Sequence, residues 1–290
     1  MTCQVMLDIR TVLWITTTTI CAIIWSLLSF DDTRFYLAFC RLNQYYWRLF
    51  GLRVFLFGDE LILRNKTLLI CNHRSMYDIL AIFYVSGHFN QVIQFCLKHS
   101  LTYVPGIGWW CRRMGFPILR RNSDDIARLR VHAVQCPILI FPEGSRYTSR
   151  KYAACMEYAQ QHNLSISKYA LLPKYKGSFA LSSSCGAVYQ LTIVYLDSHG
   201  RVMCGENNVR PSSMYINIKA QTDVPNDESD YRQWLYAQFA DIDSVLDDIQ
   251  IRKDRIEMIP SYQYLDFGIY ASIAIIIVSC VWFGVVRLCT

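Results

Sequence analysis

Short apolar runs alternate with helical patterns through the middle of this 290-residue chain. The runs that fit buried strands are residues 66–71, 91–97, 115–119, 136–141, 169–173, 189–196 and 214–219. Apolar residues recur at helical spacing in 78–85, 122–133, 149–162 and, most clearly, 231–249. This alternation predicts an α/β fold with a mixed, largely parallel sheet flanked by helices.

The two ends of the chain carry long apolar stretches. Residues 11–30 and 267–286 each contain 20 residues and no charge. As a helix, such a stretch spans roughly 30 Å, the hydrocarbon thickness of a bilayer. We therefore expect N- and C-terminal membrane helices. For the first stretch, which contains four consecutive threonines, a signal peptide and a helix lying in the membrane interface are open alternatives.

These stretches divide the chain into three parts. We expect a membrane anchor over residues 1–34, a folded domain over 35–262 and a transmembrane helix over 263–290. Basic residues follow the first stretch, and a basic cluster at 252–255 precedes the last. Because positive charge favours the cytosolic side of a membrane, the domain is expected to face the cytosol.

The cysteines and the charge of the chain indicate the state of its thiols and the kind of ligand that it binds. None of the twelve cysteines forms a Cys-x-x-Cys pair, and several lie in apolar runs, which favours free buried thiols over disulfides or zinc. The net charge of +6 is concentrated between Lys98 and Arg150, where nine Lys or Arg face three acidic residues. Nucleic acid or lipid phosphate would suit such a stretch. The two apolar ends favour lipid.

Polar clusters follow two of the predicted strands. Residues 72–78 come after the apolar run 68–71, and residues 141–146 come after 138–140. The ends of buried strands are where open α/β sheets place their chemistry. We therefore expect the two clusters to form one site.

His73 and Asp78 fit a general base and the carboxylate that orients it. A carboxylate at the start of the next helix can bond one ring nitrogen and raise the basicity of the other. No Gly-x-Ser-x-Gly elbow occurs, so we expect direct attack by a substrate hydroxyl without an acyl-enzyme. A purely structural histidine is the alternative.

The second cluster fits an anion site. Gly144 allows close approach of the backbone, Ser145 can donate a hydrogen bond and Arg146 can grip a phosphate with two bonds. Arg120, followed by Arg121, ends a third predicted strand. An ordinary turn and a solvated basic pair are the respective alternatives.

Three ordered motifs resemble those of the glycerolipid acyltransferase family, which includes the 1-acylglycerol-3-phosphate and lysophospholipid acyltransferases. They are Asn72-His73 with Asp78, residues 115–120 and residues 141–146. Residues 172–177 resemble the fourth motif of the lysocardiolipin acyltransferase-like branch. The likeness covers roughly residues 50 to 250. Ser145 departs from the usual threonine but keeps the hydroxyl, and one C-terminal span stands where that branch often has two.

The resemblance implies a role for each of these residues. His73, oriented by Asp78, would act as the catalytic base on the free hydroxyl of a lysophospholipid, whose oxygen would attack the thioester of acyl-CoA. Acyl-CoA is then a co-substrate, and neither a bound cofactor nor a metal is implied. The residues implied to hold the acceptor's glycerol phosphate are Arg120, Glu143, Gly144, Ser145, Arg146 and Lys174.

The expected function is that of a membrane-bound O-acyltransferase in lipid metabolism, acting on the sn-2 hydroxyl of 1-acylglycerol-3-phosphate to give phosphatidic acid. Its partners would be the lysophospholipid, acyl-CoA and the endoplasmic reticulum membrane, but not nucleic acid. The same chemistry on lysophosphatidylinositol or lysocardiolipin is one alternative. A hydrolase and an inactive membrane-anchored lipid-binding protein are two others.

Overall fold

The computed structural model describes residues 32–49, 51–103, 111–120, 124–203 and 210–252, together with Thr16 and Ile20. Apart from those two residues, the predicted membrane segments 11–30 and 263–290 lie outside this part of the chain. Among the helices that the structure describes, none is both long enough and apolar enough to cross a membrane.

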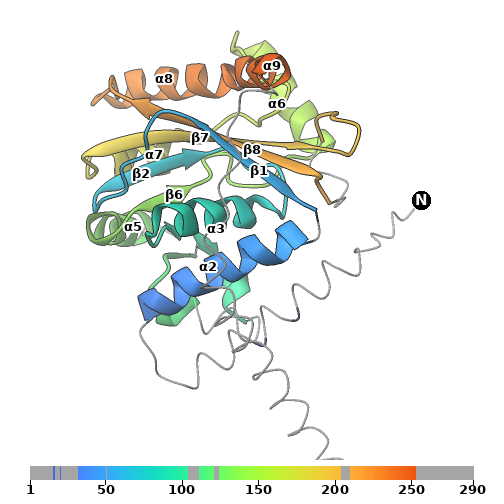
Figure 1. Cartoon of the computed structure of the whole chain (residues 1–290). Helices are drawn as coiled ribbons and strands as arrows, with labels where there is room; N and C mark the ends of the chain where they lie inside the picture. Colours follow the sequence, from blue (N-terminus) through green and yellow to red (C-terminus); the bar gives the residue numbers. More distant parts are fainter. Residues whose placement is uncertain are drawn as a thin grey trace, which may run out of the picture.

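Six strands form one mixed sheet (Figure 1). They are β1 (Arg53–Gly58), β2 (Thr67–Cys71), β3 (Gln94–Phe95), β6 (Ile138–Ile140), β7 (Ala187–Leu196) and β8 (Ser213–Gln221). Their order across the sheet is β1-β8-β7-β2-β6-β3. β7, β2, β6 and β3 run parallel to one another, whereas β8 is antiparallel to β7 and parallel to β1. The predicted mixed, largely parallel sheet is therefore confirmed.

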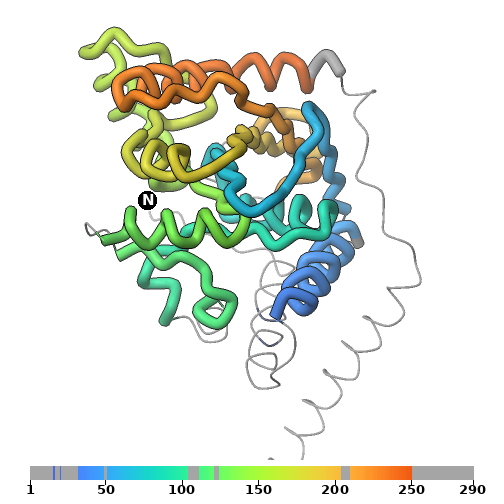
Figure 2. The backbone as a smooth tube through the Cα atoms, turned by 90° about the vertical axis from the view of Figure 1, so that its left-hand side faces the viewer, coloured from blue at the N-terminus to red at the C-terminus, as the bar shows by residue number. Residues whose placement is uncertain are grey.

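Helices cover both faces of this sheet, as Figures 1 and 2 show. On one face lies α3 (Asp78–Phe89), with α2 (Asp32–Leu49) packed against it. On the other lie α5 (Asp124–Gln135), α7 (Tyr175–Ser182) and α8 (Glu228–Ala240). The side chains of β2 alternate between the hydrophobic cores on the two faces of the sheet. Leu69 and Cys71 pack toward α2 and α3, whereas Leu68 and Ile70 pack toward α5, α7 and α8. A strand buried on both faces is apolar throughout, as this one is.

Smaller elements complete the fold. α6 (Ser149–Gln161) follows β6, and α9 (Ile242–Arg252) packs on the ends of β7 and β8. β4 (Leu97–Lys98) and β5 (Ile118–Leu119) form a separate parallel pair, and η1 (His99–Tyr103) follows β4. The expected domain boundary at residue 35 falls inside α2, which contributes Tyr36 and Trp47 to the main core.

Three sequence predictions are wrong, and four elements were not predicted. The single strand expected over 91–97 is two short strands, β3 and β4, which belong to different sheets. Residues 169–173 form no strand, because the backbone of this segment bonds the loop after β6 instead of a neighbouring strand. The single helix expected over 231–249 is two helices, α8 and α9, which meet at Asp241. The unpredicted elements are α2, β1, η1 and α7.

Candidate active site

The loops after β2 and β6 leave the same edge of the sheet. The two strands are parallel neighbours, with Leu69 opposite Leu139, so their carboxyl ends lie side by side. The backbone N–H of Tyr147 donates to the His73 carbonyl across 2.9 Å and joins the loops. The structure thus brings the two predicted polar clusters together.

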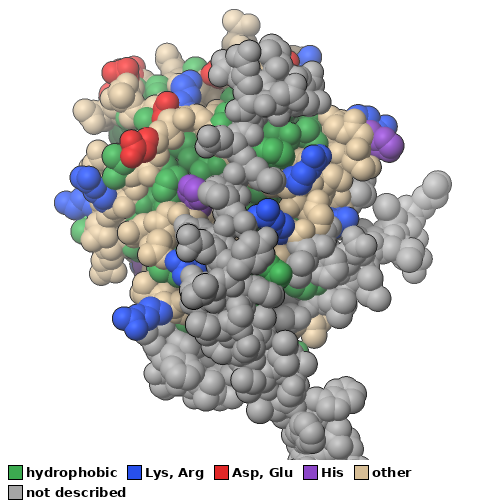
Figure 3. All heavy atoms as spheres, viewed as in Figure 1, with side chains coloured by type: hydrophobic (Ala, Val, Ile, Leu, Met, Phe, Trp, Pro, Cys, Tyr) green, Lys and Arg blue, Asp and Glu red, His purple; other side chains and the backbone are tan. Residues whose placement is uncertain are grey.

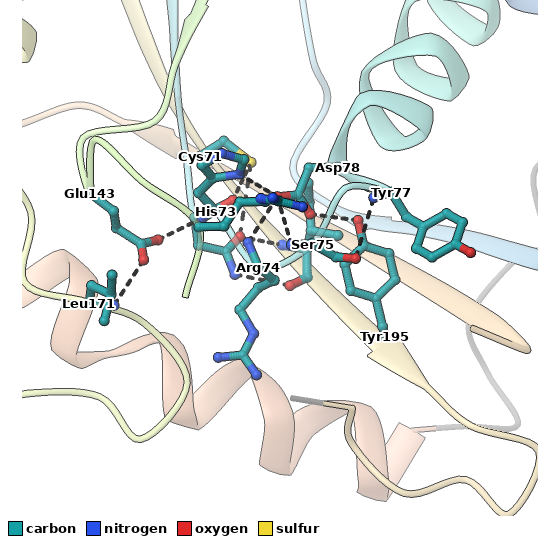
Figure 4. Close-up of polar contacts among 12 residues, drawn as sticks. Cys71, His73, Arg74, Ser75, Tyr77, Asp78, Glu143, Leu171 and Tyr195 are labelled. Carbon is teal, nitrogen blue, oxygen red and sulfur yellow. Dashed lines mark hydrogen bonds and ion pairs between the residues drawn. The ribbon is translucent and has the colours of Figure 1, made fainter. Parts of the chain in front are cut away.

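His73 and Asp78 form a direct pair (Figure 4). The distance from His73 Nδ1 to Asp78 Oδ2 is 2.6 Å. Asp78 is the first residue of α3 and is 1% exposed, whereas the His73 side chain is 24% exposed. Because an ionised carboxylate only accepts, Nδ1 carries the proton and Nε2 is the nitrogen left to accept one.

Backbone and side-chain donors hold the Asp78 carboxylate. Its Oδ2 also accepts from the backbone N–H of Arg74 (2.8 Å) and of Ser75 (3.1 Å). Its Oδ1 accepts from the Tyr195 hydroxyl at 2.7 Å. Tyr195 was not predicted as a site residue. Alternation along the predicted strand 189–196 could have placed it on one face of the sheet, but not beside Asp78.

The His73 ring and the start of its loop are held by residues in and just after two other strands. It stacks on Phe141, with ring centroids 4.2 Å apart and an interplanar angle of 23°. The Asn72 side chain bonds both backbone groups of Ile193 in β7, donating to the carbonyl (3.0 Å) and accepting from the N–H (2.7 Å). The end of β2, and with it the start of the His73 loop, is therefore fixed against β7.

Glu143 joins three segments of the chain. One oxygen accepts from the backbone N–H of His73 (2.6 Å), and the other accepts from that of Leu171 (2.9 Å). The side chain is 3% exposed, and its burial raises the pKa of Glu143 to about 8. Since both oxygens are engaged inside the protein, this geometry gives no support to the predicted contact of Glu143 with an acceptor phosphate, which stays a prediction.

Gly144 and Lys174 lie next to each other beside these loops. Gly144 is exposed and has φ of +68°, and a methyl group added there would lie 3.5 Å from Lys174 Nζ. The Lys174 N–H donates to the Pro142 carbonyl (2.8 Å). Ser145 is half-buried and Arg146 is exposed. These four predicted residues therefore share one region.

Arg120 follows the smaller of the two sheets. It follows β5 in the two-stranded sheet, where its side chain is exposed. Its backbone N–H donates to Asp125 Oδ1 across 3.1 Å. The backbone of Arg120 is thus tied to α5, and the expected contact of its side chain with the acceptor phosphate stays a prediction.

Arg74 is a buried cation that sequence reasoning missed. It is 3% exposed and donates to the carbonyls of Tyr169 and Met203, the latter at 3.1 Å. Its guanidinium lies 4.3 Å from the ring centroid of Tyr147 and 5.6 Å from that of Tyr169. Its charge also opposes the raised pKa of the buried Glu143. In the sequence, the only indication that Arg74 belongs to the site is its position between His73 and Asp78.

Cys71 is not a nucleophile of this site. It packs in the core shared with α3 and is fully buried. Burial and the nearby carboxylates of Asp78 and Glu143 raise the pKa of the Cys71 thiol well above its usual range, so the thiol stays protonated. Among the described residues there is also no cluster of three His, Cys, Asp or Glu side chains that could hold a metal.

Comparison with known proteins decides the family. Residues 53–195, which include His73, Asp78, Glu143 and Tyr195, match the family model described as Acyltransferase. The chain carries an acyltransferase-family domain. The resemblance seen in the sequence motifs is thereby confirmed.

Several relatives share part of this chain. It is 32% identical over 212 residues to a probable 1-acyl-sn-glycerol-3-phosphate acyltransferase 5 of Arabidopsis thaliana, an overlap of 68% of this chain and 56% of that protein. It is 29% identical over 163 residues to lysocardiolipin acyltransferase 1 of Mus musculus, covering 51% and 43%. The chain therefore spans about half the length of the curated relatives it matches.

The fold is similar to that of a solved structure. It is the crystal structure of the 1-acyl-sn-glycerophosphate (LPA) acyltransferase PlsC from Thermotoga maritima. The TM-score is 0.53 at 17% sequence identity, and the match covers 82% of this chain and 98% of that chain. At this identity the similarity concerns the arrangement of the backbone.

Proposed function

We propose that the protein is a membrane-associated O-acyltransferase that moves an acyl group from acyl-CoA to the sn-2 hydroxyl of 1-acylglycerol-3-phosphate, giving phosphatidic acid. The observation that carries the proposal is the His73–Asp78 pair at 2.6 Å, inside an acyltransferase-family domain. The name of the Arabidopsis thaliana relative, a probable 1-acyl-sn-glycerol-3-phosphate acyltransferase, supports the choice of acceptor.

The proposed reaction needs no protein nucleophile. His73 Nε2 takes the proton of the acceptor hydroxyl while the oxygen attacks the thioester carbonyl. Asp78 stabilises the imidazolium that forms. The new C–O bond replaces the C–S bond, and the proton on His73 passes to the leaving thiolate, so that CoA leaves as its thiol and the imidazole returns to its neutral form.

The region around Gly144 is proposed to bind the acceptor phosphate. Arg146 and Lys174 supply positive charge, and Ser145 supplies a hydroxyl donor. Arg120 would reach the acceptor phosphate only from the two-stranded sheet.

Figure 3 shows Lys and Arg side chains around an area of exposed hydrophobic side chains on one face of the molecule. A phospholipid acceptor, which has both an anionic head and an acyl chain, suits such a face.

The endoplasmic reticulum membrane is the proposed location, with the domain on its cytosolic side. The uncharged stretches 11–30 and 267–286 support this choice. Both the acceptor and the acyl chain partition into lipid, so attachment to a membrane would raise their effective concentration at the site.

A larger lysophospholipid is the second candidate acceptor. The similarity to lysocardiolipin acyltransferase 1 favours it. Both acceptors present a phosphate beside a free hydroxyl, so the residues around Gly144 serve either one.

The test supplies membranes that contain the full chain with labelled oleoyl-CoA and, separately, lysophosphatidic acid, lysophosphatidylinositol, monolysocardiolipin or no acceptor. We expect labelled phosphatidic acid from the wild type and none above background from His73→Ala. His162→Ala changes an exposed histidine in the turn after α6 and should behave like the wild type. Transfer by His73→Ala would remove the base assignment. Release of free fatty acid without any acceptor would indicate a hydrolase.

A further inference from the structure

We propose that Tyr195 is a positioning residue of this site, whose hydroxyl holds the Asp78 carboxylate so that one oxygen faces the His73 ring. The inference rests on the proposed function for its kinetic consequence. Its structural basis is the division of hydrogen bonds between the two oxygens of Asp78.

The two carboxylate oxygens of Asp78 have different sets of donors (Figure 4). Oδ2 accepts from His73 Nδ1 at 2.6 Å and from two backbone N–H groups. Oδ1 accepts from the Tyr195 hydroxyl at 2.7 Å. Tyr195 therefore fixes the oxygen that the His73 loop does not reach, and the plane of the carboxylate is set from both sides.

Burial makes this hydrogen bond consequential. Tyr195 is 3% exposed and Asp78 is 1% exposed, so bulk water has little access to replace a lost donor. Burial and the charge of Asp78 raise the pKa of Tyr195 well above its usual range, which keeps the hydroxyl protonated and donating. The neutral Tyr195 hydroxyl thus stabilises the buried charge of Asp78, which bulk water can hardly reach.

The position of Tyr195 is set by the strand that carries it. Asn72 bonds both backbone groups of Ile193, and Tyr195 lies two residues further along β7. Since alternate residues of a strand point to the same face, Tyr195 and Ile193 both belong to the core beneath α3. The bonds that hold the start of the His73 loop therefore also place the Tyr195 hydroxyl.

The other titratable groups around Asp78 are few. The His73 ring and the Arg74 cation lie on the loop that precedes Asp78. Cys71 lies on β2, and Glu143 follows β6. Removal of the Tyr195 hydroxyl leaves all four in place. The Asp78 carboxylate would then bind a proton more strongly and pull harder on the His73 Nδ1 proton, which favours the imidazolium. More base is then needed to free Nε2, so the acid limb of the rate profile should move to higher pH.

The experiment compares Tyr195→Phe with Tyr189→Phe in the full chain in membranes. Tyr189 is a buried tyrosine in the same strand and core, and its hydroxyl accepts from the Ile62 N–H (3.4 Å) instead of bonding Asp78. For Tyr195→Phe we expect kcat to fall about tenfold and the acid limb to move up by about one pH unit, with the acceptor KM unchanged. Tyr189→Phe should change neither. Wild-type kinetics in Tyr195→Phe, or equal changes in both variants, would overturn the proposal.

A second variant reverses the sign of the effect. Substitution of 3-fluorotyrosine at position 195 keeps the ring and the hydroxyl but makes the phenol a stronger donor. The acid limb should then move to lower pH, opposite to its movement in Tyr195→Phe. A shift in the same direction as in Tyr195→Phe would contradict the proposed hydrogen bond and would indicate a packing effect.

A readout without turnover separates this inference from the proposed function. The histidines are labelled with ¹⁵N in detergent-solubilised full chain, and the His73 signal is assigned by its loss in His73→Gln. Tyr195→Phe should shift the pH midpoint of that signal and Tyr189→Phe should not. If the midpoint stays in place, the inference is wrong whatever the enzyme does. If it shifts while no lysophospholipid is acylated, only the proposed function is wrong.

Discussion

The Glu143 carboxylate accepts a 2.6 Å hydrogen bond from the backbone N–H of His73, although 70 residues separate the two in sequence. Its other oxygen accepts from Leu171. One side chain therefore holds the loop after β2 and the segment before α7 to the loop after β6. The position of the proposed base depends on a buried acid that itself need not touch a substrate.

Glu143→Gln should weaken this connection. The amide NH₂ would face one of two backbone N–H donors, so one hydrogen bond is lost and a buried donor is left unpaired. We expect the free energy of unfolding to fall by about 1–3 kcal/mol, with a loss of kcat. Denaturant titration and the acyl transfer assay measure the two effects. Glu157→Gln, on the exposed side of α6, is the control, and equal stability of the two variants would argue against the connection.

The same residue predicts a dependence of stability on pH. Burial raises the pKa of Glu143 from 4.5 to about 8, so the folded state binds the proton more tightly than the unfolded state. Its contribution to stability is complete below about pH 4.5 and is lost as the pH rises through about 8. The stability advantage of the wild type over Glu143→Gln should therefore shrink across this window, by up to a few kcal/mol. An advantage that stays constant between about pH 5 and 8 would contradict the raised pKa.

Arg74→Lys should destabilise the His73 loop despite the retained charge. A lysine ammonium cannot bond the carbonyls of Tyr169 and Met203 together or stack on the Tyr147 ring as the guanidinium does. We expect a loss of about 2–3 kcal/mol in the free energy of unfolding. Arg201→Lys is the matched control, because Arg201 bonds Asp197 on the surface, where such pairs contribute about 0–1 kcal/mol. Similar losses in both would show that the burial of Arg74 has no special effect.

Gly144→Ala should impair binding of the acceptor. The backbone at this position has φ of +68°, a left-handed conformation that costs a residue with a Cβ about 1–2 kcal/mol. The added methyl group would meet only Lys174 at ordinary contact distance, so the effect arises from the backbone. We expect a raised KM for the acceptor with little change in kcat. Gly177→Ala, inside α7 with open space around it, should leave KM unchanged and raise stability by up to about 1 kcal/mol.

The sequence predicts that the two polar clusters meet, but the only pair of site residues that it predicts in contact is local. His73 and Asp78 lie five positions apart at the end of a clearly apolar strand, so their pairing follows from the strand–loop–helix pattern alone. The contacts to Glu143 and Tyr195 link residues 70 and 117 positions apart. They depend on the order of strands in the sheet, which no local pattern specifies. The burial of Arg74 depends likewise on Tyr169 and Met203, 95 and 129 positions away.

The wrong elements have a related cause. Residues 169–173 are apolar enough for a strand, but Leu171 and Lys174 give their backbone N–H groups to Glu143 and Pro142. The apolar character of this segment correctly indicates that it is buried. It does not show that its backbone bonds a loop instead of a neighbouring strand. The pattern over 231–249 continues through Asp241, because Ile242 and Leu246 are buried as well, and this continuity conceals the break between α8 and α9.

His73 and Asp78 are made early in synthesis, whereas Tyr195 is made more than a hundred residues later. β7, which carries Tyr195, pairs with β2 on one side and with β8 on the other, so both edges of β7 are covered only after β8 has been synthesised. A nascent chain that ends before β7 would therefore lack both the Tyr195 donor to Asp78 and the hydrogen bonds between Asn72 and Ile193. The proposed acyl transfer would then require synthesis of the chain at least through β7.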